Sequence, residues 1–138
     1  MDKTKVIQVI ENAKTIRIKG LDFVLSFGID EICKAYNGIG PQFLPEDLRD
    51  KVTNTLHIFE PAALVHDLRF EQSDGTREAF DRANAEFVVN CRKCARHEYA
   101  WYNWKRYRAH FIIKAMNAFN CGDGGWKAWN DACESKGK

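Results

Sequence analysis

The spacing of hydrophobic and polar residues predicts a mainly α-helical protein. Residues 4–13 place apolar side chains on one side of a helix, and a second helix is expected over 28–35. Between them, residues 15–19 alternate apolar and polar side chains, which favours a strand or extended arm and hence a small β element within 15–27. Residues 37–60 contain glycine and proline at short intervals, which predicts a long loop with one helical turn at 45–51.

The second half of the chain carries the longer helical patterns. Pro61 suits the first turn of a helix over about 61–72, and Thr76 suits the N-cap of a helix over about 77–96. A short turn joins these two segments, so we expect an antiparallel helix pair. An additional C-terminal helix is expected over 99–119, with one or two further turns at 126–133.

Length and composition indicate one globular domain, residues 1–138, since 45% of the residues are hydrophobic. The net charge of +2 is too small to indicate a class of binding partner. No segment approaches the roughly 20 apolar residues of a membrane span, so no transmembrane segment is expected. The first 14 residues lack the apolar stretch of a signal peptide, so we expect synthesis in the cytoplasm.

The five cysteines are an odd number, and with no signal peptide they are expected to be free thiols in a reducing compartment. Cysteine is also a common core residue. A zinc site is the alternative. Its ligands would be Cys91, Cys94, His97 and Cys121.

The residue pair His66-Asp67 is the most unusual feature of the predicted helix 61–72. The sequence around it, from Pro61 to Phe70, is otherwise largely apolar, so the helix is expected to be buried. Ionisable groups are rare on a buried surface unless they have a partner or a chemical task. The pair is therefore the first candidate for a functional site.

An acid on the second helix can supply the partner. Asp81 lies at the edge of the apolar side of helix 77–96, where its carboxylate can accept a hydrogen bond from one ring nitrogen of His66. The other nitrogen is then free to act as a general base. Asp67 points about 100° away from His66, toward a glycine-containing loop at 36–41. Carbonyls of such a loop together with a carboxylate suit Ca²⁺, and a base beside a metal can drive water onto an ester carbonyl.

Three motifs in this order resemble secretory-type phospholipase A2. The loop Tyr36-x-Gly38-x-Gly40, the pair His66-Asp67 and the segment Asp81-Arg82-Ala83-x-Ala85 are similar to the calcium loop, catalytic helix and second helix of that family. The short spacing between the last two motifs is more similar to the compact phospholipase domain of parvovirus capsid proteins. The resemblance covers roughly residues 33–97.

The resemblance implies calcium-dependent hydrolysis of the sn-2 ester of glycerophospholipids. His66 would activate water, and Asp81 would orient His66. The calcium ligands would be Asp67 and the backbone carbonyls of Tyr36, Gly38 and Gly40. The expected partner is then a phospholipid membrane surface and not a nucleic acid. The enzyme would reach that surface through a phage particle, a secretion machine or cell lysis.

The segment 99–108 mixes aromatic with basic side chains. Such a mixture suits a lipid headgroup surface or a nucleic-acid backbone. We expect it to contact anionic membranes. The candidate residues are Trp101, Trp104, Lys105, Arg106 and Tyr107. The alternative is a helix whose tryptophans pack in the core and whose basic side is solvated.

Other interpretations of the same residues stay open. His66 can be a core histidine bonded to a backbone carbonyl, and Asp81 can form a salt bridge to Arg77 or Arg82. The chain can be a phospholipase-like scaffold that binds without turnover. It can also be a nucleic-acid-binding protein that uses the basic residues within 92–108.

Overall fold

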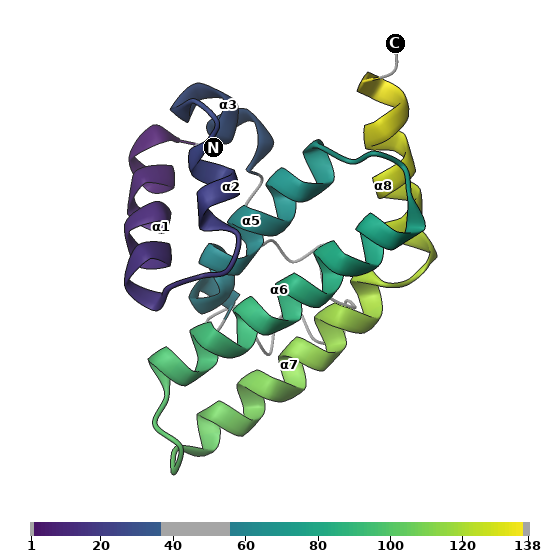
Figure 1. The fold of residues 1–138 in the computed structure, drawn as a ribbon. Coiled ribbons are helices and arrows are strands. Elements are labelled where there is room, and N and C mark those ends of the chain that lie inside the picture. Colours follow the sequence, from purple (N-terminus) through teal and green to yellow (C-terminus); the bar gives the residue numbers. More distant parts are fainter. Residues whose placement is uncertain (1, 37–55, 137–138) are drawn as a thin grey trace.

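A computed structural model describes residues 2–36 and 56–136 of the chain. Over these ranges it contains seven α-helices, one short 3₁₀ helix and no strand (Figure 1). The mainly α prediction is confirmed for this part of the chain. The elements are α1 (Lys3–Ile16), α2 (Leu21–Leu25), α3 (Ile29–Ala35), η2 (His57–Phe59), α5 (Glu60–Glu71), α6 (Arg77–Glu98), α7 (Trp104–Asn120) and α8 (Asp123–Lys136).

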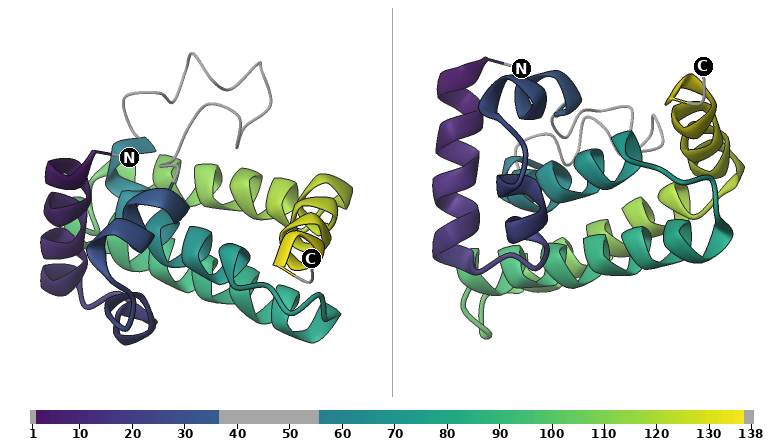
Figure 2. Two further views of the ribbon diagram at one scale, coloured as in Figure 1. Left: turned by 90° about the horizontal axis from the view of Figure 1, so that it is seen from above. Right: turned by 45° about the horizontal axis from the view of Figure 1, so that its top comes forward.

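Helix α5 is the centre of the fold. It packs against α1, α2, α3, α6 and α8, and seven of its twelve residues are buried. Figure 2 shows α1 and α8 at opposite ends of the layer that α5, α6 and α7 form. The predicted pair of helices 61–72 and 77–96 is therefore present as α5 and α6. Because α5 is enclosed on several sides, any polar residue on it must find its partner inside the protein.

The small β element expected within 15–27 is wrong. Ile16 ends α1, and Arg17 follows with a left-handed backbone at φ 63°. The next residues form a turn that a side chain holds in place: the Asn90 amide donates to the Lys19 carbonyl and accepts from the Lys19 N–H, both at 2.8 Å. The alternating apolar and polar residues at 15–19 therefore belong to a helix end and a turn. The backbone of the turn needs no partner strand, because the Asn90 side chain supplies its hydrogen bonds.

Helices α6 and α7 form a long hairpin along one side of the molecule (Figure 1). Helix α7 starts at Trp104, later than position 99, because Asn103 caps it by accepting a hydrogen bond from Lys105 N–H at 3.0 Å. It buries one face, made of Ala109, Ile112, Ile113, Met116 and Asn120. The opposite face of α7 is consequently left outside the core.

Helix α8 closes the far end of the α5–α6 pair. Trp129 is buried against the rings of Phe70 and Phe80, with centroids 5.0 and 5.9 Å away. The predicted turn at 126–133 is thus part of a longer helix. The turn expected at 45–51 lies outside the described residues. No helix within the described ranges is both long and apolar enough to span a bilayer, which agrees with the prediction of no transmembrane segment.

Candidate functional site

His66 lies inside the protein, in the middle of α5. Only 5% of its surface is exposed, and its ring contacts those of Phe70 and Phe87 with centroids 4.4 and 4.7 Å away. Its Nε2 lies 2.9 Å from Asn84 Oδ1 on α6. Asn84 Nδ2 in turn lies 3.4 Å from the Asn120 carbonyl. An amide nitrogen must donate to that carbonyl, so Asn84 Oδ1 accepts and His66 Nε2 carries the proton.

Burial keeps this imidazole neutral. Removal from water lowers the pKa of His66 from 6.5 to about 4, although the hydrogen bond to Asn84 opposes part of the change. A general base has to reach a water molecule or a substrate proton. With 5% of its surface exposed, His66 does not offer that access in this conformation. The arrangement is that of a core histidine, bonded to a side chain instead of a backbone carbonyl.

Asp81 is not the partner of His66. It lies exposed on α6, and its Oδ1 is 3.4 Å from Arg77 Nε, one helical turn earlier. The salt bridge to Arg77, which was the alternative for Asp81, is present. The predicted His66–Asp81 dyad is therefore not assembled. Asn84 takes that place because it shares the buried side of α6 with Phe80 and Phe87, whereas Asp81 falls to the side.

The predicted calcium ligands can be placed only in part. Tyr36 is buried, and the pKa of its hydroxyl is raised first by burial and then by the nearby negative charges of Glu60 and Asp67. Glu60 is itself paired with Lys5, at 2.7 Å, and Asp67 is half-buried. Gly38 and Gly40 lie outside the described residues. Within the described ranges, no three His, Cys, Asp or Glu side chains are grouped as a metal site.

The cysteines are free thiols, as expected, and do not form the alternative zinc site. Cys91 and Cys94 are buried in the core, where desolvation raises the pKa of both thiols, that of Cys94 to about 12. His97 is exposed. Cys121 follows the end of α7 and its Sγ lies 3.3 Å from Asn117 Oδ1. Neutral, buried thiols of this kind are inert packing groups.

A cleft of about 630 Å³ opens where α2, α5, α6 and α8 meet. Its wall includes Arg69, which makes two hydrogen bonds to Glu86, at 3.1 and 3.3 Å, and lies 4.0 Å from the centre of the Phe23 ring. This guanidinium is held by Glu86 and by the Phe23 ring. His66 and Asp67 are not among the residues that line the cleft, so it is not an entrance to the predicted catalytic pair.

The accessible feature of unusual chemistry is on the α6–α7 hairpin. Five aromatic side chains of its turn and of the first two turns of α7 are between 61 and 75% exposed. They are Trp101, Tyr102, Trp104, Tyr107 and Phe111, and we call them the aromatic surface. The alternative that the tryptophans of this segment pack in the core is wrong for Trp101 and Trp104. Lys105 is exposed and Arg106 is half-buried beside them.

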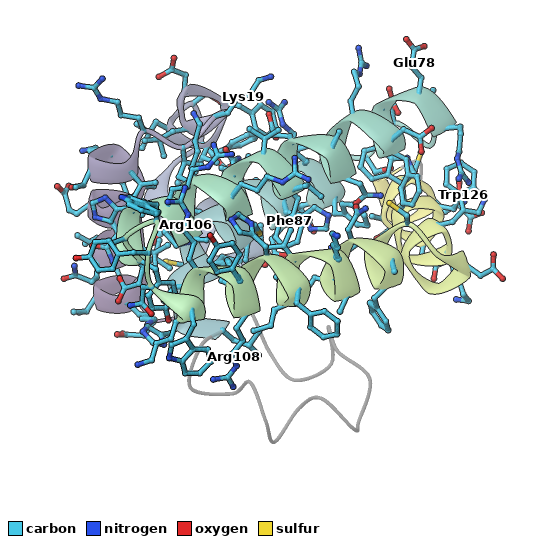
Figure 3. The ribbon with its side chains drawn as sticks, turned by 90° about the horizontal axis from the view of Figure 1, so that it is seen from below. Lys19, Glu78, Phe87, Arg106, Arg108 and Trp126 are labelled. Carbon is cyan, nitrogen blue, oxygen red and sulfur yellow. The ribbon has the colours of Figure 1, made fainter. Side chains whose placement is uncertain are left out.

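Positive charge accompanies the aromatic surface on two sides. In Figure 3, Arg106 lies between the α6 and α7 ribbons, whereas Arg108 extends from the other side of α7. The pKa of His110 is lowered by partial burial and then by the positive charges of four residues. These are Arg106, Arg96, Arg92 and Lys114. The two helices thus bring several cations close to one imidazole.

Comparison of the chain with models of protein families, with curated proteins and with solved structures finds no match. The geometry itself separates the two candidate sites. The His66–Asn84 pair is enclosed and neutral, and the aromatic surface is open and flanked by cations.

Proposed function

We propose that the protein is a binding protein that attaches to anionic phospholipid surfaces through the α6–α7 hairpin. The observation that carries the proposal is the exposure of the aromatic surface, 61–75% for five side chains that are neighbours on one turn and one helix. Soluble proteins commonly expose single apolar residues, but a group of large exposed aromatic side chains on one hairpin is typical of an interaction site.

The charge of this segment defines the class of partner. From position 99 to position 122 the chain has four Lys or Arg residues and no Asp or Glu. Lys105, Arg106, Arg108 and Lys114 are these four cations. A segment with this charge is attracted to an anionic layer, where each cation near the surface adds about 1 kcal/mol. The partner is therefore expected to be negatively charged.

The position of the aromatic side chains favours a membrane over a nucleic acid. Trp101 and Tyr102 lie in the turn that projects from one end of the molecule (Figures 1 and 2). Tryptophan and tyrosine at a projecting tip, with cations behind them, match the headgroup region of a bilayer, which accepts the rings and attracts the charges. Phe111 continues the surface without any polar atom, which suits insertion among the lipids.

Binding without turnover is the form of the proposal that agrees with the described geometry. A phospholipase A2 mechanism needs a base that reaches water, and His66 is enclosed and bonded to Asn84. Calcium-dependent hydrolysis, as the sequence predicts it, gives a different result with the same vesicles. Under that prediction fatty acid is released when Ca²⁺ is present and release stops with a chelator. We expect no release in either condition.

Sedimentation with phosphatidylserine-containing and with neutral vesicles tests the proposal. Wild-type protein should sediment with the anionic vesicles, and Trp104→Ala with Tyr107→Ala should remove most of that binding. Ile7→Ala with Leu25→Ala is the matched control, since these residues are also exposed, at 48 and 45%, but lie on α1 and α2. The proposal fails if both double variants bind like the wild type. It also fails if the protein binds an oligonucleotide but not the anionic vesicles, or if Trp104→Ala converts a dimer into a monomer and leaves vesicle binding unchanged.

A further inference from the structure

The cations beside the aromatic surface form two rows on neighbouring helices. Arg92 and Arg96 are four residues apart on α6, and Arg106, His110 and Lys114 follow the same spacing on α7. Side chains four residues apart share one side of a helix. Helices α6 and α7 pack against each other, so the two rows face outward along their common groove. We call these five residues the basic cluster.

The basic cluster is compact, and its cations take part in no salt bridge among the described residues. The four cations all lie near enough to His110 to oppose its protonation and so lower its pKa. The salt bridges of the described residues use Lys5, Lys14, Arg69, Arg77 and Lys127, and none of them includes a member of the cluster. Four like charges that none of these salt bridges neutralises raise the free energy of the folded protein, and an anionic ligand would relieve that repulsion.

The dimensions of the cluster define the ligand more closely. Along the helix axes, rows of four to eight residues extend about 6–12 Å, given a rise of about 1.5 Å per residue. Across the groove, the two rows are about 8–10 Å apart, which is the usual distance between packed helices. One phosphodiester is small for this area and meets one or two cations. A headgroup that carries several phosphates on one ring presents its charges over a comparable area.

We propose that the basic cluster binds lipid headgroups that carry several phosphates, and that it gives the membrane attachment a preference among anionic lipids. This inference rests on the proposed function, because the aromatic surface brings the cluster to the bilayer. On α7 the cluster and the aromatic surface are adjacent: His110 follows Tyr107 by three residues, and Lys114 follows Phe111 by three. Rings can therefore enter the headgroup layer while the groove between α6 and α7 meets the phosphates.

Vesicles that contain phosphatidylinositol bisphosphate, compared with phosphatidylserine vesicles of equal surface charge, test the preference. Wild-type protein should bind the phosphoinositide vesicles more tightly. Arg92→Gln with Arg96→Gln should remove the preference, with a loss of about 30-fold, which corresponds to roughly 1 kcal/mol for each cation. Arg82→Gln with Lys34→Gln removes the same charge from exposed positions on α6 and α3 and should retain the preference.

The arms of this experiment separate the two proposals. Equal binding to both vesicle types by the wild type overturns the headgroup preference and leaves membrane attachment in place. Two results together support both proposals. The double variant Trp104→Ala, Tyr107→Ala should lose all vesicle binding. The double variant Arg92→Gln, Arg96→Gln should still bind vesicles but without the headgroup preference. Inositol trisphosphate in solution is the third arm. It should compete with phosphoinositide vesicles for the protein. In an NMR titration it should also raise the pKa of His110, because phosphates bound by the cluster offset the surrounding positive charges. An unchanged His110 resonance would mean that the phosphates bind elsewhere and would overturn the inference.

Discussion

At the scale of the residue, the pattern of the sequence identified His66 as unusual but not its partner. Two polar residues of α6 were within reach, Asp81 and Asn84. The choice depends on the rotation of α6, and this is fixed by Phe80, Ala83 and Phe87 on its buried side. Asn84 lies among them and could have been found from that spacing. Asp81 lies at the edge of the apolar side of α6, and an acid suits a histidine partner chemically, but the exposed edge does not reach the buried ring of His66.

Acid should destabilise the protein through His66. Its pKa is about 4 in the folded state, because the ring is buried, and near 6.5 when unfolded. The unfolded chain thus binds the proton more readily between these values. The free energy of unfolding should fall as the pH drops from about 6.5 to about 4, by roughly 3 kcal/mol. Urea denaturation at several pH values measures this change. In His66→Gln that part of the pH dependence should disappear; an unchanged slope would mean that His66 is not enclosed.

Asn84 and Asp81 should differ sharply as mutation sites. Asn84→Ala leaves the Nε2–H of His66 buried without an acceptor, so it should lower the free energy of unfolding by about 1–3 kcal/mol. Asp81→Asn changes an exposed salt bridge to Arg77, and an effect within about 0.5 kcal/mol is expected. Thermal melts of the two variants give the comparison. A larger loss for Asp81→Asn than for Asn84→Ala would restore the predicted dyad.

At the scale of the element, helices were predictable where a long apolar face continued over several turns, as in α5 and α6. The segment after α1 was not predictable, because its conformation depends on Asn90, 71 residues further along the chain from Lys19. The start of α7 was also missed, since Tyr99 continues the helical pattern while Asn103 provides the cap. Local pattern therefore gives the existence of a helix, and side chains from elsewhere determine where the chain turns.

The crossing of α8 over the end of α7 depends on Gly125. A Cβ at this position would lie 1.9 Å from the Asn120 carbonyl oxygen, and backbone cannot move aside as a flexible side chain does. Gly125→Ala should therefore destabilise the protein by about 1–3 kcal/mol or more. Gly124→Ala is a matched control with open space around it, and replacing glycine in a helix should stabilise by up to about 1 kcal/mol. Similar melting temperatures for the two variants would contradict this packing.

At the scale of the whole molecule, the aromatic segment could be recognised from composition, but its orientation could not. Tyr107 and Phe111 are as apolar as many core residues, and α7 has two opposite faces that could each have been buried. The buried face of α7 includes Ile112, Ile113 and Met116, and α7 packs against α6. The core is completed elsewhere by Trp129. Tryptophans of one small protein thus lie in different environments, buried or exposed, which depend on the assembled fold.

Trp104 and Trp129 should separate binding from stability. Trp129 is 3% exposed and packs on Phe70 and Phe80, so Trp129→Ala should lower the free energy of unfolding by about 3–5 kcal/mol. Trp104 is 64% exposed, so Trp104→Ala should change it by less than about 1 kcal/mol. Vesicle binding per folded molecule should show the reverse order: weakened in Trp104→Ala and retained in Trp129→Ala at a temperature where that variant is folded. Urea melts and sedimentation on the same preparations provide both values. If Trp104→Ala instead destabilises the protein while folded molecules still bind vesicles, Trp104 is a packing residue and the aromatic surface is not the attachment site.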